Sequence, residues 1–150
     1  MSDTTSGQIP PSIARVLSRF QAMGREEKMQ ALLHYSKKLE PLPDRFQTID
    51  RGSFTVPECQ TRVDVFPEYQ HGKMHFYADL NVKQSPTIAA FLSILFSAIN
   101  DQPPATTLAI PEDFVLQVME GIGLSGREVG LNAMVLRIKR YARDAAQRAA

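Results

Sequence analysis

Cys59 is the only cysteine in this chain of 150 residues, and it is the first candidate for chemistry. A lone thiol cannot form an internal disulfide or build a thiolate metal cage by itself. Its possible roles are nucleophile, sulfur carrier, or small buried hydrophobe without chemistry. Pro57 stiffens the backbone and favours an extended conformation at Val56. The sequence therefore predicts that residues 55–63 form a short loop between two strands and display Cys59 near its tip.

Histidines could assist this thiol, and the chain has three: His34, His71 and His75. A nucleophilic pair with Cys59 is conceivable, because the hairpin that carries His71 and His75 follows the loop. A zinc site built from the same residues would match no standard spacing. The simplest role of His75 is a polar position on the open face of a sheet. A thiol enzyme that uses Cys59 with His71 or His75 is thus one hypothesis, and no motif supports its geometry.

Other motifs for chemistry are missing from the sequence: it has no serine-hydrolase elbow, no P-loop and no dinucleotide fingerprint after a strand. The glycines between residues 121 and 126 favour the end of one helix and the start of the next. Arg127 lies at that predicted helix start, where the helix dipole favours an anion. It could pair with a thiolate or persulfide if the fold brings it to Cys59, and it is otherwise a surface arginine.

Composition indicates one globular domain over residues 1–150, with a flexible start at residues 1–10. Hydrophobic residues make up 43% of the chain and charged residues 22%. The net charge of +1 implies no general attraction to nucleic acid or to a membrane surface. The longest apolar run, residues 88–99, is too short to span a bilayer. One cysteine and no signal-like start predict a cytoplasmic protein.

The elements expected before and around the loop follow from hydrophobic spacing. Apolar residues at helical spacing predict a helix near residues 13–20 and a second one over residues 25–39, with Met29, Leu32, Leu33 and Ser36 on its inner side. Strands are expected near residues 62–66 and 74–82, joined by a hairpin connection at residues 68–73.

The second half of the chain is predicted to be mainly helical. Ser85 and Pro86 start a helix that is apolar on nearly all sides and ends near residue 100. Residues 106–110 are expected to be extended, and a short helix follows from residue 111. The last helix begins with a capping box, in which Ser125 is the cap and Glu128 reaches back to it, and Leu124 and Val129 are the hydrophobic staple. Its apolar stripe is Leu131, Met134, Val135, Ile138, Tyr141, Ala142 and Ala145.

Three stretches in chain order resemble the SufE family, whose members are sulfur-acceptor partners of group II cysteine desulfurases. Residues 26–43 resemble the family's N-terminal region and its proline-rich exit. Residues 56–63, VPECQTRV, resemble the sulfur loop, which is usually VxGCxSxV. Residues 124–139, from LSGREVGLNAM onwards, resemble the last helix. The resemblance covers the chain from about Val16 to Arg143.

The resemblance implies an α+β fold, with a small antiparallel sheet packed against several helices as in SufE and IscU. It implies that Cys59 accepts persulfide sulfur from a desulfurase like SufS or CsdA, stimulates it, and passes the sulfur to a scaffold complex like SufBCD. Arg127 matches the family's arginine in the final helix and is implied to support this site. The chain would be an accessory sulfurtransferase, a monomer or weak dimer without a cofactor or metal, and pyridoxal phosphate would belong to the desulfurase.

The sequence departs from the family pattern around the cysteine. Glu58 replaces a glycine, which removes backbone freedom and places beside the thiol a carboxylate that disfavours the thiolate. Thr61 replaces a serine, Asp64 stands where an aromatic is common, and residues 82–85 replace an acidic motif. A second hypothesis is therefore a binding or regulatory module that has the SufE fold but does not transfer sulfur.

Overall fold

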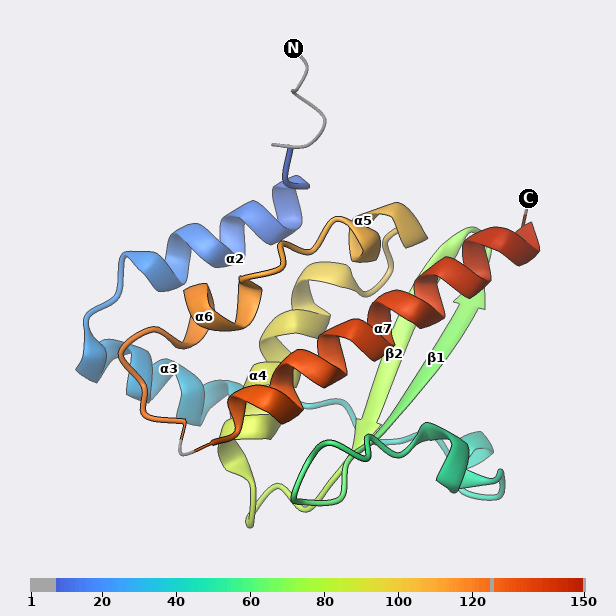
Figure 1. The fold of residues 1–150 in the computed structure, drawn as a ribbon, viewed down its shortest axis with the longest axis horizontal. Coiled ribbons are helices and arrows are strands. Elements are labelled where there is room, and N and C mark those ends of the chain that lie inside the picture. Colours follow the sequence, from blue (N-terminus) through green and yellow to red (C-terminus); the bar gives the residue numbers. More distant parts are fainter. Residues whose placement is uncertain (1–7, 125, 150) are drawn as a thin grey trace.

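The computed structural model of the chain describes residues 8–124 and 126–149 as a group of helices with a two-stranded antiparallel sheet at one side (Figure 1). In chain order the elements are α2 (Pro11–Gln21), α3 (Arg25–Ser36), the 3-10 turns η1 (Asp44–Phe46) and η2 (Arg51–Phe54), β1 (Asp64–Gln70), β2 (Lys73–Asp79), α4 (Pro86–Ile99), α5 (Pro104–Leu108), α6 (Phe114–Met119) and α7 (Glu128–Ala149). The predicted α+β class is confirmed. Of the start that was predicted to be flexible, residues 1–7 lie outside the described residues.

Helix α4 forms the centre of the fold, as its apolar sequence predicts. Its side chains are buried on nearly every side, including Phe91, Leu92, Ile94 and Leu95, which have no exposed surface. The helix contacts α2, α3 and the inner face of β2. Within the described residues, no helix is both long and apolar enough to cross a membrane.

The sheet is a hairpin of β1 and β2 with a register from Asp64 opposite Asp79 to Gln70 opposite Lys73. His71 and Gly72 form the two-residue turn with positive φ angles of 55° and 78°. Such a pair is typical of the type I′ turn, whose twist matches that of the strands. The other end of the hairpin, at Asp64 and Asp79, is where the loop that carries Cys59 leaves the sheet.

Helix α7 crosses the molecule in front of the hairpin and contacts β1, α5 and α6 (Figure 1). Its predicted stripe is confirmed, because Leu131, Met134, Ile138, Ala142 and Ala145 are fully buried, Val135 nearly so, and Tyr141 partly buried. Ser125, the predicted cap, lies outside the described residues. The predicted staple is wrong: Leu124 is buried but Val129 is 67% exposed.

Two other predictions about local structure are wrong. Residues 106–110 are not extended, because Pro104 starts the short helix α5 and Ile110 follows it. Helix α3 ends at Ser36, and its buried face is Lys28, Leu32 and Ser36. Met29 and Leu33, which were expected inside, are exposed.

The face of α3 is set by a polar contact rather than by apolar periodicity. The Lys28 ammonium is buried and donates to the Glu120 carbonyl at 2.8 Å. Arg25 Nε donates to the Gly121 carbonyl at 3.2 Å. These bonds satisfy carbonyls at the end of α6, which would otherwise lack helical partners. Helix α3 thereby holds the segment that leads into α7.

Candidate functional site: the cysteine loop and the first turns of helix α7

Residues 56–63, here called the cysteine loop, have a stem that continues the sheet. Thr55 and Asp64 form an antiparallel bridge, and the Val56 amide donates to the Val63 carbonyl at 2.9 Å. Val56 and Val63 are both buried in the core. The stem is therefore fixed by backbone bonds and by apolar packing on either side of the cysteine.

The tip of the loop is a turn from Val56 to Cys59, with Pro57 at the position that favours proline. The Cys59 amide closes it by donating to the Val56 carbonyl at 3.3 Å. Among the described residues other than glycine, the positive φ angles belong to His71 and Asp101, so Glu58 has ordinary backbone geometry. The replacement of the family's glycine by Glu58 thus needs no strained conformation.

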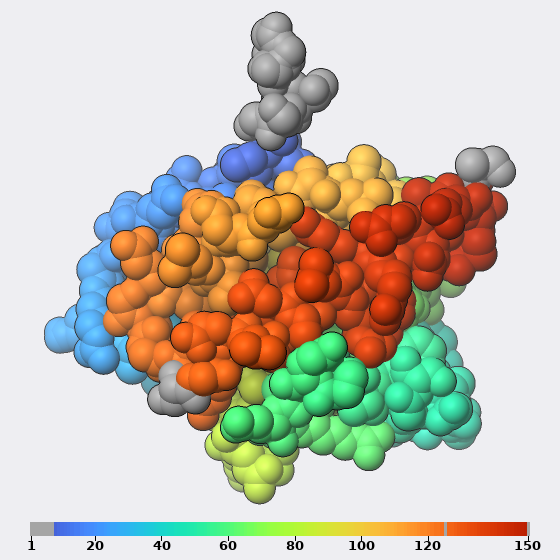
Figure 2. Space-filling view, in the orientation of Figure 1, coloured from blue at the N-terminus to red at the C-terminus, as the bar shows by residue number. Residues whose placement is uncertain are grey.

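Cys59 is partly buried and lies on the wall of a cavity of about 310 Å³, here called the thiol cavity. The loop forms one wall, and the first turns of α4 and α7 form the other. Figure 2 shows the green loop pressed against the orange start of α7. The residues that line this cavity are Glu58, Cys59, Gln60, Thr61, Ile88, Gly126, Arg127, Val129, Gly130 and Leu131.

Arg127 lies on the wall of the thiol cavity formed by the start of α7. Its carbonyl accepts the amide of Leu131 at 3.0 Å, and its Nη1 donates to the Leu124 carbonyl at 3.2 Å. The chain turns into the helix at Gly126, whose φ of 84° suits glycine. Arg127 and Cys59 therefore line one cavity at the N-terminal end of a long helix.

Gly130 is the residue of α7 against which the cysteine packs. A β-carbon at this position would lie 3.3 Å from the Cys59 α-carbon and 3.5 Å from its Sγ. Glycine therefore lets the helix backbone approach the loop more closely than another residue would. We did not predict this contact from the sequence, although a glycine inside a helical pattern is the kind of signal that indicates a close approach.

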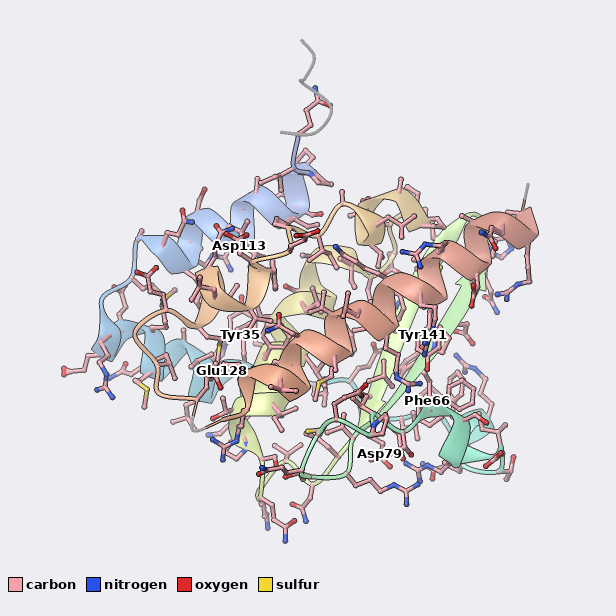
Figure 3. All side chains as sticks on the ribbon, in the orientation of Figure 1. Tyr35, Phe66, Asp79, Asp113, Glu128 and Tyr141 are labelled. Atoms are coloured by element: carbon pink, nitrogen blue, oxygen red, sulfur yellow. The ribbon has the colours of Figure 1, made fainter. Side chains whose placement is uncertain are left out.

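A cluster of charged side chains at the Asp64 end of the hairpin holds the stem of the cysteine loop in place. Asp64 and Asp79 face each other across the hairpin, and Arg51 of η2 bonds to both carboxylates (Figure 3 labels Asp79). The Arg51–Asp64 distance is 3.2 Å, and Thr55 Oγ1 donates to Asp64 at 2.5 Å. Two carboxylates opposite each other on a sheet repel, so Arg51 is what allows this register. The hydrogen bond to Asp79 and the charges of the two carboxylates raise the pKa of the Arg51 guanidinium.

Aromatic side chains join η2 to the sheet and to α7. Phe54 packs on Phe66 with ring centroids 4.9 Å apart and on Tyr141 at 6.3 Å, and Figure 3 labels Phe66 and Tyr141 close together. Arg137 of α7 also donates to the Ser53 carbonyl at 3.3 Å. The segment before the cysteine loop is thus held by the same helix that carries Gly130.

The histidines lie away from the thiol. His71 occupies the hairpin turn, about 20 Å along the strands from the Asp64 end. His75 contacts Glu40 Oε1 at 2.8 Å and Asp101 Oδ1 at 3.0 Å. Within residues 8–124 and 126–149, no histidine lines the thiol cavity. The arrangement does not support the hypothesis of a thiol enzyme that uses His71 or His75 as a base.

A metal site is not supported either. In the part of the chain that the structure describes, no group of three or more His, Cys, Asp or Glu side chains is placed to hold a metal ion. The site is defined by one thiol, one arginine and a cavity between a loop and a helix start. It belongs to an α+β domain with a single partly sheltered cysteine.

Comparisons with known proteins agree with this class. A family model described as "SufE: Fe-S metabolism associated domain" matches residues 14–142. An uncharacterized SufE-like protein of Mycobacterium tuberculosis, found in strains CDC 1551 and H37Rv, is 32% identical over 95% of this chain and 99% of its own length. The solution structure of a hypothetical protein from Thermus thermophilus has a TM-score of 0.80 at 28% identity and covers 93% of this chain and 99% of its own.

The chain therefore belongs to the SufE family, and its family is associated with iron–sulfur metabolism. The resemblance inferred from three short stretches is confirmed over nearly the whole chain.

Proposed function

We propose that this protein carries sulfur as a persulfide on Cys59 and delivers it to iron–sulfur cluster assembly. The observation that supports the proposal most strongly is the placement of the single thiol at a turn tip, on the wall of a cavity of about 310 Å³ shared with Arg127. A carrier needs a thiol that a partner can reach and a cavity beside it that can shelter the loaded sulfur. The family's association with iron–sulfur metabolism agrees with this role.

The proposed donor is the cysteine persulfide of a group II cysteine desulfurase. The Cys59 thiolate attacks the outer sulfur of that persulfide, and a bond forms between Cys59 Sγ and the transferred sulfur. The bond between that sulfur and the donor's Sγ breaks, and the donor leaves as a thiolate that takes up a proton. Sulfur changes its carrier without net oxidation or reduction, so the step needs no metal or redox cofactor on this chain.

Unloading the desulfurase in this way frees its cysteine for another turnover, and the proposal therefore includes stimulation of the desulfurase. The sulfur would then be handed to an iron–sulfur scaffold complex. The single cysteine suits this role, because a second thiol near Cys59 could attack the persulfide and release the sulfur. Arg127 would stabilise the negative charge on the thiolate or on the persulfide.

The direct test is intact-mass analysis after the protein is mixed with a group II cysteine desulfurase and free cysteine. A reductant-sensitive gain of roughly 32 Da marks one added sulfur. We expect this gain on the native chain and its absence in Cys59→Ser. Arg127→Ala should slow the gain more than Arg127→Lys, since lysine keeps the positive charge.

The second candidate is a binding or regulatory module of the SufE family, and Glu58 beside the thiol is the observation that favours it. This module would bind the desulfurase without accepting sulfur. No mass gain, together with co-elution of the two proteins and a desulfurase that loads a known acceptor, would support this candidate. If Glu58→Gly then restores the gain, the carboxylate is the cause of the loss.

A further inference from the structure

We propose that Gly130 is a positioning residue that sets how far Cys59 is retracted against helix α7. Because Gly130 has no side chain, Cys59 can pack close to the backbone of α7. A side chain at this position would push the turn tip outward. The consequence of this contact for sulfur transfer rests on the proposed function. The contact between Gly130 and Cys59 does not depend on that function.

The geometry at Gly130 differs from that at the other glycines whose surroundings are known. A β-carbon at Gly24, Gly72, Gly121, Gly123 or Gly126 would meet no atom within 4 Å, and at Gly52 it would meet only a side-chain oxygen of Asp50. At Gly130 it would meet the backbone of a different element, at 3.3 Å from the Cys59 α-carbon. Backbone cannot rotate out of the way as a flexible side chain can, so a side chain at position 130 would displace the turn tip by a few tenths of an ångström if the helix stays in place.

The position inside α7 strengthens this interpretation. Gly130 is the only glycine of a helix that runs from Glu128 to Ala149, and it is buried. Glycine is among the weakest helix formers, and alanine is the strongest. The helix therefore gives up local stability at a residue that packs against the cysteine.

The loop can yield at its tip while its stem stays fixed. The bridge between Thr55 and Asp64 and the bond between Val56 and Val63 lie outside the turn. The Cys59 amide donates to the Val56 carbonyl of the stem at 3.3 Å, and this long bond can open when the tip moves outward. Pro57, Glu58 and Gln60 are exposed, so little apolar surface beyond Cys59 holds the tip in place.

A single methyl group at position 130 would therefore change how exposed the Cys59 thiol is. With glycine at position 130, Cys59 rests partly buried against the helix and reacts when the tip moves out. With alanine, the resting tip lies farther out and the thiol meets reagents more often. A partner that displaces the tip from Gly130 on docking would produce the same state.

The test measures the rate at which iodoacetamide alkylates Cys59 in the native chain, relative to the rate in the unfolded chain. We expect Gly130→Ala to react faster than the native chain by roughly threefold or more, because thiol access controls the rate. Asn132→Ala is the matched control. It places the same residue on the exposed side of the same helix, gains helix propensity, and should react at the native rate. An unchanged or slower rate in Gly130→Ala, with native circular dichroism, overturns the proposal.

A second measurement uses the native chain and covers the case in which Gly130→Ala does not fold. In nuclear magnetic resonance spectra of the native chain, the α-protons of Gly130 should show a nuclear Overhauser contact with the β-protons of Cys59, because a β-carbon on Gly130 would lie 3.5 Å from the Cys59 β-carbon. The absence of this contact overturns the proposal. Neither measurement involves a desulfurase, so a failure of sulfur loading would count against the carrier function alone.

Discussion

The charge cluster behind the cysteine loop should contribute to stability in a strongly non-additive way. Asp64 is only 1% exposed, faces Asp79 across the sheet, and receives Arg51 at 3.2 Å. Arg51→Met would leave the Asp64 carboxylate buried without its main counterion. Loss of one partner of a buried pair costs about 3–5 kcal/mol. Thr55 and Arg62 still contact Asp64, so we expect a smaller loss of about 2–3 kcal/mol in the free energy of unfolding.

The companion change, Asp64→Asn, keeps the shape of the side chain and an oxygen that can accept from Thr55. Arg51 still pairs with Asp79 in this variant, so we expect a loss of only about 1 kcal/mol. Once the buried charge is gone, the removal of Arg51 matters less. In the Asp64→Asn background, Arg51→Met should cost about 1 kcal/mol or less, which gives a coupling energy of about 1–2 kcal/mol.

The assay is urea unfolding of the four chains of this cycle, followed by far-ultraviolet circular dichroism. Arg62→Met is a matched control, because Arg62 contacts the same carboxylate at 3.4 Å but its side chain is 66% exposed. An exposed ion pair contributes little, so this control should lose less than about 0.5 kcal/mol. Single losses that add within about 0.5 kcal/mol in the double variant would refute the idea that Arg51 compensates a buried charge.

Two further predictions concern other parts of the fold. Burial opposes protonation of His75, but its bonds to two carboxylates outweigh burial and raise its pKa. The stabilisation it provides is therefore full below the pKa of the unfolded chain and is lost as the pH rises through the folded pKa. In urea unfolding, His75→Gln should cost about 1 kcal/mol more at pH 5.5 than at pH 8.5, and an equal cost at both would contradict this. Thr107 is fully buried, and within the described residues its hydroxyl has no hydrogen-bond partner. Thr107→Val should therefore leave stability unchanged or raise it by up to about 1–2 kcal/mol, and a thermal melt that shows clear destabilisation would contradict this.

Sequence patterns predicted well those elements whose pattern extends over many consecutive residues. Helix α4 is apolar on nearly all sides, and the stripe of α7 extends over many turns, so hydrophobic spacing alone identifies both. The hairpin was predicted from apolar strands on both sides of a turn that contains glycine, but its connection was predicted too long: residues 68–70 and 73 are strand, and only His71 and Gly72 form the turn. Short elements were predicted less well. Helix α5 has five residues, too few to show a period, and its two threonines favour a strand.

In the site, too, short sequence motifs identified single residues but not the contacts between residues that are far apart in the chain. Cys59 and Arg127 could be named from the family resemblance, and the structure places both on one cavity. The contacts that shape this cavity join residues far apart in the chain, such as Gly130 with Cys59 and Arg51 with Asp79. The inner face of α3 was misassigned for a related reason. Lys28 is buried because a carbonyl at the end of α6 accepts its ammonium, and no apolar pattern reports such a bond.

The thiol cavity is also assembled late during synthesis of the chain. Its outer wall is the start of α7, and Gly130 follows Cys59 by about 70 residues. At ordinary rates of translation, the ribosome adds these residues in roughly 4–14 seconds. Until then the cysteine has no helix to pack against, and a nascent thiol is open to oxidants that the folded protein partly excludes. Newly made chains are therefore the population in which Cys59 is most exposed to oxidation.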